Sequence, residues 1–379
     1  MTPIESFRLH LKASMIGRDN EVDLAILALC SGEHALYVGP PGVAKSYLIN
    51  NIIKGCGAKG FSLLMTMFTT PEEVFGPFRL TALQRDEYTR NLDGKACCAE
   101  IFFADECYKA SSAILNSLLT LMQERAYDNG GVRVDCPLLS MFGASNELPD
   151  PEDNLGALHD RFALRTWVKP VPKPMRMKLW TTKLPDVQQI CSVGDFKTAK
   201  AKAKSMPWST DANTVFEKVI SAVEDDAHVT IGDRRTMKAR TICQAAAAMD
   251  GDSEVKPHHL ECLRFVLWEQ KDQIDQVTQI VLREANPDQM LLDEFSDEIE
   301  AIQNRPPKDH VAAQPVHLKV ADMVAKIKTL RESSKKSTVL AAAEELEIEM
   351  QALATQMAPA MVRRLMKLSK SVEMPPLPV

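Results

Sequence analysis

The sequence predicts an α/β fold built on a doubly wound parallel sheet, followed by helical modules. Five short apolar runs alternate with helix-compatible stretches, and polar side chains directly follow several of these runs. The apolar runs fall at residues 35–38, 61–66, 100–104, 138–143 and 164–168. Ligands of such sheets bind beyond the carboxyl ends of the strands. The polar residues at those ends are therefore the first candidates for a functional site.

The first apolar run leads into a glycine-rich turn and then into a helix-compatible stretch. The turn and the helix start comprise Gly39, Pro40, Pro41, Gly42, Val43, Ala44, Lys45, Ser46 and Tyr47. Such a turn presents backbone N–H groups and a positive helix end to phosphate oxygens. Lys45 can reach the β- and γ-phosphates, and the Ser46 hydroxyl can ligate Mg²⁺. The segment thus predicts binding of a nucleoside triphosphate with Mg²⁺.

Ala44 occupies the place where the usual phosphate loop has its second glycine. Because a Cβ disfavours positive φ, we expect an alanine here only if the backbone keeps φ negative. A chance Gly-Pro turn before a helix is the alternative interpretation of these eight residues taken alone. The polar residues after the later runs favour the phosphate loop.

Acidic and amide side chains follow the third and fourth apolar runs. Asp105 is placed to hold the Mg²⁺ shell, and Glu106 to orient and polarise an attacking water. Asn146 follows the next run, where its amide can hold the water or contact the γ-phosphate. The plain structural alternatives are strand-end acids at a turn and an asparagine that caps a loop.

Arginines follow in two later segments. Arg161 ends the phrase Leu158-His-Asp-Arg, and Arg234 and Arg235 open a helical segment. Guanidinium groups stay charged and donate in a fixed fork, which suits phosphate contacts across an interface.

This order of motifs resembles that of AAA+ ATPases, and the connecting segments are similar to the MoxR family, most closely its RavA branch. The resemblance is dense from about Ile16 to Val168 and traceable to about residue 285. Its phrases are Gly39 to Ser46, Thr70-Pro-Glu-Glu-Val-Phe-Gly-Pro77, Ala113-Ile-Leu-Asn-Ser-Leu-Leu119, Ala144-Ser-Asn-Glu-Leu-Pro149, Leu158 to Arg161 and Gly232-Asp-Arg-Arg235. RavA-like proteins also carry a small β-rich domain after the lid; nothing in this sequence resembles it.

The resemblance implies three domains and assigns roles to the candidate residues. The domains are an AAA+ nucleotide-binding core at 1–172, an α-helical lid at 173–285 and a C-terminal helical extension at 286–379. The implied roles are Walker A for Lys45 and Ser46, Walker B for Asp105 and Glu106, and sensor 1 for Asn146. Ser46 and Asp105 would hold Mg²⁺, and ATP would be the nucleotide.

The resemblance also implies residues that reach the nucleotide from elsewhere. Arg161 matches the arginine finger, which would enter the neighbouring subunit's site. Arg234 matches sensor 2 on the lid of the same subunit, with Arg235 as the fallback because the two are adjacent. Ile16 and Gly17 match the segment near the adenine in relatives.

The resemblance implies ATP hydrolysis at the subunit interfaces of a hexameric ring. It also implies that hydrolysis is coupled to chaperone-like remodelling or activation of a client protein. A von Willebrand factor A protein is the implied partner. Two alternatives remain open: a nucleotide-gated scaffold that remodels nothing, and a nucleic-acid-processing AAA+ motor. A simple P-loop kinase is disfavoured, because it has no use for Arg161 or a lid.

Composition narrows these classes. The 379 residues carry a net charge of −6 with a pI of about 5.8, so no global field favours nucleic acid. No stretch approaches the roughly 20 apolar residues of a membrane span, and the N-terminus lacks the features of a signal peptide. We therefore expect a cytoplasmic protein whose nine cysteines are reduced. Cys107 follows Glu106, and its oxidation is a further hypothesis.

Three patterns outside the strand ends carry their own expectations. Residues 127–134 contain an Asn-Gly hairpin signal, which predicts either a pore-facing hairpin or an ordinary surface turn. Residues 69–77 are a second candidate pore loop, in which Phe75 is either exposed or part of the core. We expect His258 and His259 to be surface or capping residues rather than metal ligands.

The C-terminal stretch shows two apolar stripes at helical spacing after a linker at Asn304-Arg-Pro-Pro307. The stripes are Val320, Met323, Ile327 and Leu330, and then Leu346, Met350, Leu353 and Met357. Residues 304–379 carry 12 Lys and Arg against 8 Asp and Glu, a balance of +4. A helical hairpin is expected, packed on its own lid or on another protein, before a disordered end at 374–379.

Overall fold

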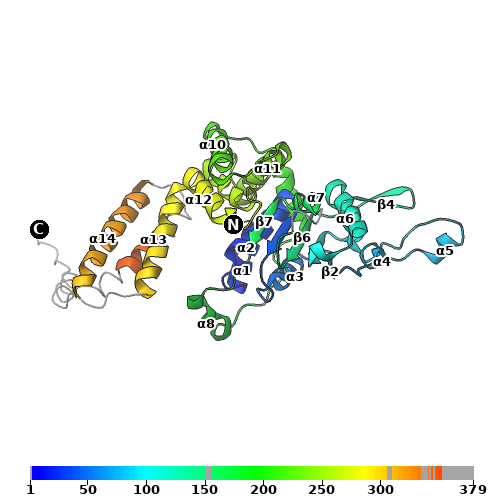
Figure 1. The fold of residues 1–379 in the computed structure, drawn as a ribbon, viewed down its shortest axis with the longest axis horizontal. Helices are drawn as coiled ribbons and strands as arrows, with labels where there is room; N and C mark the ends of the chain where they lie inside the picture. Colours follow the sequence, from blue (N-terminus) through cyan, green and yellow to red (C-terminus); the bar gives the residue numbers. More distant parts are fainter. Residues whose placement is uncertain are drawn as a thin grey trace, which may run out of the picture. The chain divides into compact units, whose positions relative to one another are not determined.

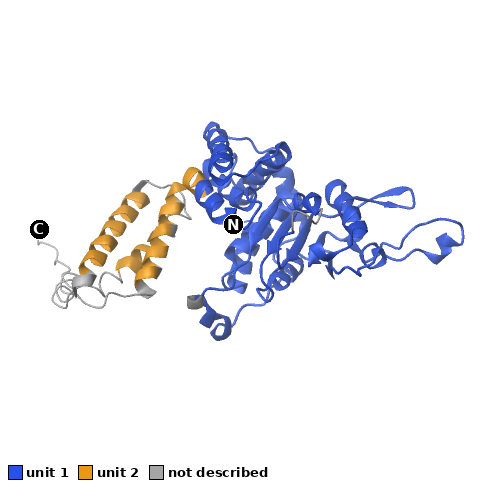
Figure 2. Cartoon of the chain, in the orientation of Figure 1, with its two compact units in different colours: residues 1–281 blue, residues 282–379 orange. Residues whose placement is uncertain are grey.

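The computed structural model describes residues 2–149, 155–304 and 310–333, together with 340, 343, 344 and 346–351. The chain forms two compact units, residues 1–281 and 282–379 (Figure 2). The expected core and most of the expected lid fall together in the first unit. The boundary between them at residue 172 stays a prediction.

Five parallel strands form the central sheet of the first unit in the order β2-β3-β6-β1-β7 (Figure 1). Their bounds are β1 Ala35–Val38, β2 Gly60–Leu64, β3 Ile101–Asp105, β6 Ser140–Ser145 and β7 Leu164–Trp167. All residues of β1 and β6 are buried, as expected of strands covered on both faces. The doubly wound parallel sheet is confirmed. Because β6 pairs with both β1 and β3, the ends of these three strands lie side by side.

Helices and short 3-10 turns surround this sheet. They are α1 Pro3–Ser14, α2 Asp19–Ser31, α3 Lys45–Gly55, α4 Pro71–Phe75, α5 Leu80–Leu83, η1 Ala96–Cys98, η2 Cys107–Lys109, α6 Ser112–Glu124 and α7 Gly156–His159. Local chemistry fixes several of their starts. Thr2 caps α1 by accepting from the Glu5 N–H at 3.1 Å, and Pro3 takes the first helical position, where no N–H is needed.

The expected hairpin forms from β4 Ala126–Asn129 and β5 Val132–Asp135. Its two loop residues, Gly130 and Gly131, have φ of 67° and 81°, which is the type I′ geometry that matches strand twist. Phe75 belongs to the core: it is 1% exposed, and its ring stacks on Tyr127 with centroids 4.9 Å apart. The exposed aromatic of the preceding loop is instead Phe68, at 82%.

The remainder of the first unit is helical, as the sequence predicts. It contains α8 Lys173–Thr181, α9 Val193–Lys204, α10 Thr210–Ala227, α11 Asp233–Asp250, η4 Pro257–Phe265 and the start of α12 Gln273–Ala285. Helix α10 begins at an N-cap, Ser209, whose side chain accepts from Ala212 N–H. Its buried face includes Phe216, Val219 and Val223. No helix in the described ranges is both long and apolar enough to cross a membrane.

The second unit contains α13 Pro287–Asn304 and α14 His310–Ser333. Their apolar faces share one core, which also takes in three side chains of the following stretch. The members are Leu292, Phe295, Ile299, Val320, Met323, Ile327, Leu330, Ala343, Leu346 and Met350. The first expected stripe is therefore part of this core, along with the described half of the second. Leu353, Met357, residues 305–307 and the end at 374–379 lie outside the described residues.

Candidate functional site

The phosphate loop leaves β1 and runs into α3. Gly39 has no room for a side chain, since an added Cβ would lie 2.3 Å from the Val168 carbonyl oxygen. Gly42 has a φ of 80°, in the left-handed region. Ala44 corrects the expectation of a negative φ: it caps α3 with a φ of 67°. The surrounding loop holds this alanine in a conformation that costs an L-residue about 1–2 kcal/mol.

Lys45 lies at the centre of the loop and is only 9% exposed. Its Nζ donates to the carbonyl oxygen of Gly39 at 2.5 Å and to Asn146 Oδ1 at 3.2 Å. Burial lowers the pKa of Lys45, and the nearby carboxylates of Glu106 and Asp105 oppose that shift. The ammonium is thus held in the loop by neutral oxygens that phosphate oxygens can replace.

Ser46, in the first turn of α3, meets Asp105, at the end of β3, although the two are 59 residues apart in the chain. Ser46 Oγ donates to Asp105 Oδ2 at 3.1 Å, and Asp105 Oδ1 accepts from the Glu106 N–H at 3.1 Å. A hydroxyl and a carboxylate oxygen are the hard donors that Mg²⁺ prefers. The residues present fit a magnesium ion at this position.

Glu106 follows Asp105 in the left-handed region, with a φ of 51°. Its carboxylate accepts a hydrogen bond from Asn146 Nδ2 and lies 3.2 Å from Lys109 Nζ. Strain of this kind in a non-glycine residue is typical of functional sites. We call Lys45, Ser46, Asp105, Glu106 and Asn146 the nucleotide edge, because all five converge at neighbouring strand ends.

The segment before α2 is tied to this edge by Arg18. This residue is 6% exposed, and its guanidinium donates to the carbonyl oxygens of Val43 at 3.1 Å and Lys169 at 2.9 Å. Sequence reasoning missed Arg18, because its partners are distant in the chain and no local pattern marks it. Gly17, which precedes it, has a φ of 66°.

A cavity of about 430 Å³ lies beside this segment. Residues from α2 and the segment before it, and from β7, α8, η4 and α12, line the cavity; they include Gly17, Arg18, Trp167, Met175, Ile274 and Thr278. Ile16 directly precedes Gly17 in the chain. The Arg18 contacts join this cavity to the phosphate loop, so a ligand in the loop could extend into it.

The arginines gather at a different place. Arg161 donates to Gln123 Oε1 at 2.9 Å, and Arg234 reaches the same oxygen at 3.4 Å. Arg234 also lies 3.9 Å from Asp160, and its side chain is 45% exposed. Long-range packing thus brings Arg234, at the start of α11, to α6 and α7 in this structure. Its role at the same subunit's phosphate loop stays a prediction.

Arg235 is more buried than Arg234, since only 11% of its side chain is exposed. Its guanidinium lies 2.8 Å from Glu269 and 3.6 Å from Asp160, so it is already paired with two carboxylates. We call Gln123, Asp160, Arg161, Arg234 and Arg235 the arginine edge. Sequence reasoning missed Gln123, a helical glutamine without a motif.

Cys107 lies beneath the nucleotide edge and is fully buried. Burial strongly raises the pKa of its thiol, which disfavours the reactive thiolate. The structure therefore speaks against the oxidation hypothesis. All nine cysteines are free thiols.

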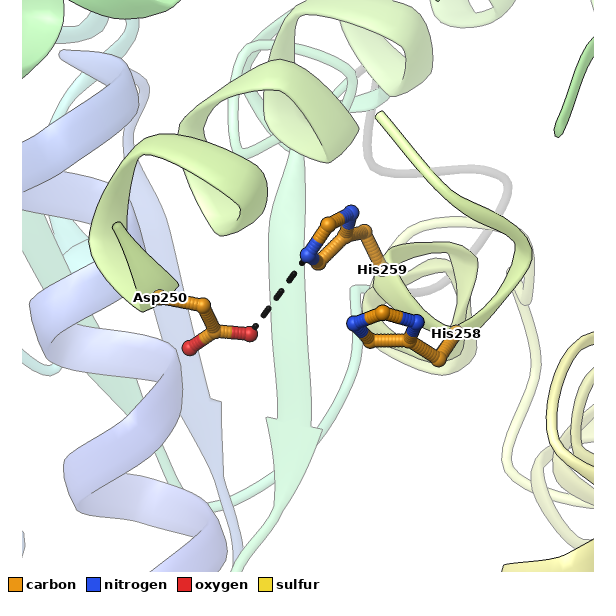
Figure 3. A group of neighbouring side chains, drawn as sticks. All are labelled: Asp250, His258 and His259. Atoms are coloured by element: carbon orange, nitrogen blue, oxygen red, sulfur yellow. Dashed lines mark ion pairs between the residues drawn. The ribbon is translucent and has the colours of Figure 1, made fainter. Parts of the chain in front are cut away.

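Asp250, His258 and His259 form a separate cluster at the end of α11 (Figure 3). His259 Nδ1 accepts from the Lys256 N–H at 2.9 Å, as a helix cap. Nε2 of the neutral ring therefore carries the proton, and it lies 3.1 Å from Asp252 Oδ2 and 3.7 Å from Asp250 Oδ2. A metal needs a free lone pair on that nitrogen. The capping interpretation is confirmed for His259.

Family models match the chain in two places. Residues 3–184 match the MoxR domain of MoxR-vWA-beta-propeller ternary systems, and residues 214–281 match an AAA lid domain. Two proteins of unassigned function from Methanocaldococcus jannaschii are 33% and 34% identical over 75% and 74% of the chain, and 76% and 74% of their own length. The chain belongs to the MoxR family of AAA+ ATPases. Its sheet is the AAA+ core, followed by an α-helical lid.

A more distant relative and a solved structure of similar fold also match the chain. Chaperone MoxR1 of Mycobacterium tuberculosis is 27% identical over 51% of this chain and 52% of its own length. The fold resembles that of a candidate ATPase from Cytophaga hutchinsonii, with a TM-score of 0.59 and 16% identity, over 75% of this chain and 94% of that one. Membership of the RavA branch stays a prediction.

Proposed function

We propose that this MoxR-family protein hydrolyses ATP with Mg²⁺ at the interfaces of a homo-oligomeric ring and uses the cycle to remodel or activate a client protein. The observation that carries the proposal is the nucleotide edge. A buried ammonium, an oxygen pair suited to Mg²⁺ and a carboxylate held by an amide lie at three adjacent strand ends. That combination serves phosphoryl transfer to water.

Each residue of the nucleotide edge has a part in this reaction. Lys45 exchanges its carbonyl and amide partners for the β- and γ-phosphate oxygens. Ser46 and Asp105 would hold the magnesium ion, which would supply neutralisation of the charge that develops on the phosphates. Glu106 orients the attacking water and polarises it, while Asn146 keeps the carboxylate and the water in line.

The cavity beside Arg18 is the proposed site of the nucleobase. Its wall combines apolar and aromatic side chains with backbone groups of the Gly17 segment, which is the usual composition of a small-molecule site. Ile16 and Gly17 are proposed as base-proximal residues. The Val43 contact of Arg18 would then hold the base and the phosphates at a fixed separation.

We assign the arginine edge to the neighbouring subunit's nucleotide. Arg161 and Arg234 share one neutral acceptor, Gln123, and Arg234 also lies 3.9 Å from the exposed carboxylate of Asp160, so both can turn to an incoming phosphate. An arginine supplied in trans typically contributes about 10³–10⁵ in rate, so an isolated protomer should be nearly inactive. Arg235, paired with Glu269, is the less accessible of the two lid arginines.

The finer features of the proposal come from relatives. The name of MoxR1 supports chaperone-like work on a client, and the family model's description supports a von Willebrand factor A partner. A hexameric ring in the cytoplasm completes the proposal. Nucleic acid is not proposed as a partner, because the net charge is −6.

The test is ATPase activity measured against protein concentration for the wild type and for Arg161→Ala, with mass photometry on the same samples. We expect specific activity to rise cooperatively as rings form, and Arg161→Ala to abolish the rise while ATP still binds. Specific activity that does not change with protein concentration, or that is the same in Arg161→Ala as in the wild type, would contradict hydrolysis at a shared interface.

A further inference from the structure

A chain of three side chains, of which Arg165 is buried and Tyr108 and His159 are half-buried, connects the two edges. Tyr108 belongs to η2, the short turn that begins directly after Glu106. His159 ends α7, two residues before Arg161. Tyr108 Oη lies 2.7 Å from His159 Nδ1, and Arg165 Nη1 lies 2.6 Å from His159 Nε2. These residues make no part of the phosphate loop or of the arginine edge, yet they join the segments that carry both.

The donor and acceptor roles along this chain follow from chemistry. A guanidinium has no acceptor, so Arg165 donates to His159 Nε2. His159 Nδ1 must then carry the proton of the neutral ring and donate to Tyr108 Oη. Burial, followed by the charges of Arg165 and Arg235, lowers the pKa of His159 to about 3. The imidazole is therefore held in one tautomer and one orientation.

Arg165 extends the chain to the lid. It lies on β7, is 1% exposed, and donates through Nη2 to the Val266 carbonyl oxygen at 3.1 Å. Its guanidinium also lies over the Trp268 ring, 5.3 Å from the centroid. Its Nε has no hydrogen-bond partner among the described residues. Burying such a cation against neutral partners is costly, which favours a positional role over a stabilising one.

At the other end of this chain, a movement of Glu106 would be transmitted to Tyr108. Tyr108 is two residues from Glu106, and the Lys109 N–H bonds the Glu106 carbonyl oxygen at 2.9 Å, so the turn is short and closed. Beneath it, Cys107 packs against Gly143, where an added Cβ would lie 3.1 Å from its Sγ. A shift of Glu106 towards a bound nucleotide cannot be absorbed inside this turn, and it would displace the Tyr108 hydroxyl.

We propose that Tyr108 and His159 are positioning residues that couple the nucleotide edge of one subunit to its own arginine edge, so that the occupancy of one site sets the position of Arg161 at the next. The inference rests on the proposed function, because it assigns Arg161 to a neighbouring nucleotide. It adds a route by which adjacent sites of the ring communicate. Neither residue touches the nucleotide in this scheme.

The first test compares Tyr108→Phe, which removes only the hydroxyl, with the wild type. We expect kcat to fall about tenfold and the affinity for a fluorescent ATP analogue to change less than about twofold. In an Arg161→Ala background, Tyr108→Phe should cause no further loss.

His159→Leu should behave like Tyr108→Phe, whereas His159→Gln should recover part of the rate, because its amide can accept from Arg165 and donate to Tyr108. Tyr127→Phe, on the hairpin, is the matched control.

The second test does not depend on catalysis. Hydrogen exchange of the backbone amides of α7 is followed after addition of a non-hydrolysable ATP analogue or ADP. The wild type should show a nucleotide-dependent change in protection at α7, and Tyr108→Phe should lose it. A persisting response at α7, or an equal fall in kcat with and without Arg161, would overturn the inference. A wild type without ATPase activity at any concentration would instead defeat the proposed function.

Discussion

The nucleotide edge and the arginine edge lie in the same unit of one chain but differ in how complete they are. At the nucleotide edge Lys45 is 9% exposed, and its cation, carboxylates and amide already contact one another. At the arginine edge Arg234 and Asp160 are 45% and 40% exposed, and two guanidinium groups share a single neutral oxygen. The first edge is assembled by the fold of one subunit, whereas the second holds Arg234 and Arg161 through contacts that are partly exposed.

This difference indicates a division of labour. Arg161 donates to neutral oxygens and the ion pair of Arg234 is exposed, so both guanidinium groups can leave their present contacts at small cost. A buried polar group at the nucleotide edge that loses its partner has a larger free-energy cost. A phosphate must therefore replace each contact that it displaces. We therefore expect a substitution at the nucleotide edge to impair only the subunit's own site. A substitution at the arginine edge should impair the site of the neighbouring subunit.

The largest expected effect comes from mixing two inactive variants. Arg161→Ala and Glu106→Gln should each lower ATPase activity by at least about 10²-fold. A one-to-one mixture should regain roughly a quarter of wild-type activity, because some interfaces combine an intact Glu106 with an intact Arg161. The measurement is steady-state phosphate release after subunit exchange.

The matched control for that mixture pairs two variants of the same edge. Lys45→Ala mixed with Glu106→Gln should stay inactive, since every site then lacks one residue. If ATPase activity recovers in this control mixture, or does not recover in the first mixture, the proposed distinction between the two edges is wrong.

Glu106→Gln alone sharpens the account of the nucleotide edge. The amide keeps the shape of the side chain but cannot accept a proton, so we expect kcat to fall by about 10²–10³ while ATP stays bound. Equilibrium binding of a labelled nucleotide and single-turnover hydrolysis separate the two effects. If client activation persists unchanged in this variant, the scaffold alternative is favoured over remodelling.

Acid should weaken the region beneath the arginine edge. The pKa of His159 is lowered to about 3 in the folded protein, against about 6.5 when unfolded. The unfolded chain takes up the proton first, so this contribution to stability is present above pH 6.5 and is lost as the pH falls towards 3. His159→Gln should therefore reduce the pH dependence of the free energy of unfolding by up to about 1.4 kcal/mol per pH unit. Denaturant unfolding at pH 8, 6 and 5 measures it, and an unchanged pH dependence would contradict the buried neutral imidazole.

The smallest expected effect concerns backbone strain in the phosphate loop. Ala44→Gly removes the Cβ from a residue with a φ of 67° and should raise the free energy of unfolding by up to about 1 kcal/mol. Gly42→Ala, at a φ of 80° with open space around it, is the matched control and should lower that free energy by a similar amount. Thermal unfolding of both variants tests whether φ alone decides the sign.

Much of the nucleotide edge could be predicted from sequence for a simple reason. The carboxyl ends of parallel strands share one side of a sheet, so Lys45, Asp105 and Asn146 had to lie near one another once their strands were recognised. The hairpin was predictable because its Asn-Gly-Gly turn encodes φ > 0 locally. The apolar stripe of α14 likewise specifies which face of that helix is buried, without reference to any partner.

The three-dimensional fold alone decided the features that depend on distant packing. The sequence could not show that the loop imposes a positive φ on Ala44, that Phe75 stacks on Tyr127, or that Arg234 joins Arg161 at Gln123. It also gave no sign of the link between Tyr108 and His159, which are 51 residues apart. Local patterns encode the type of each element and the end that faces a ligand. Which elements pack side by side depends on the whole folded core, and the site residues that meet across elements are fixed only there.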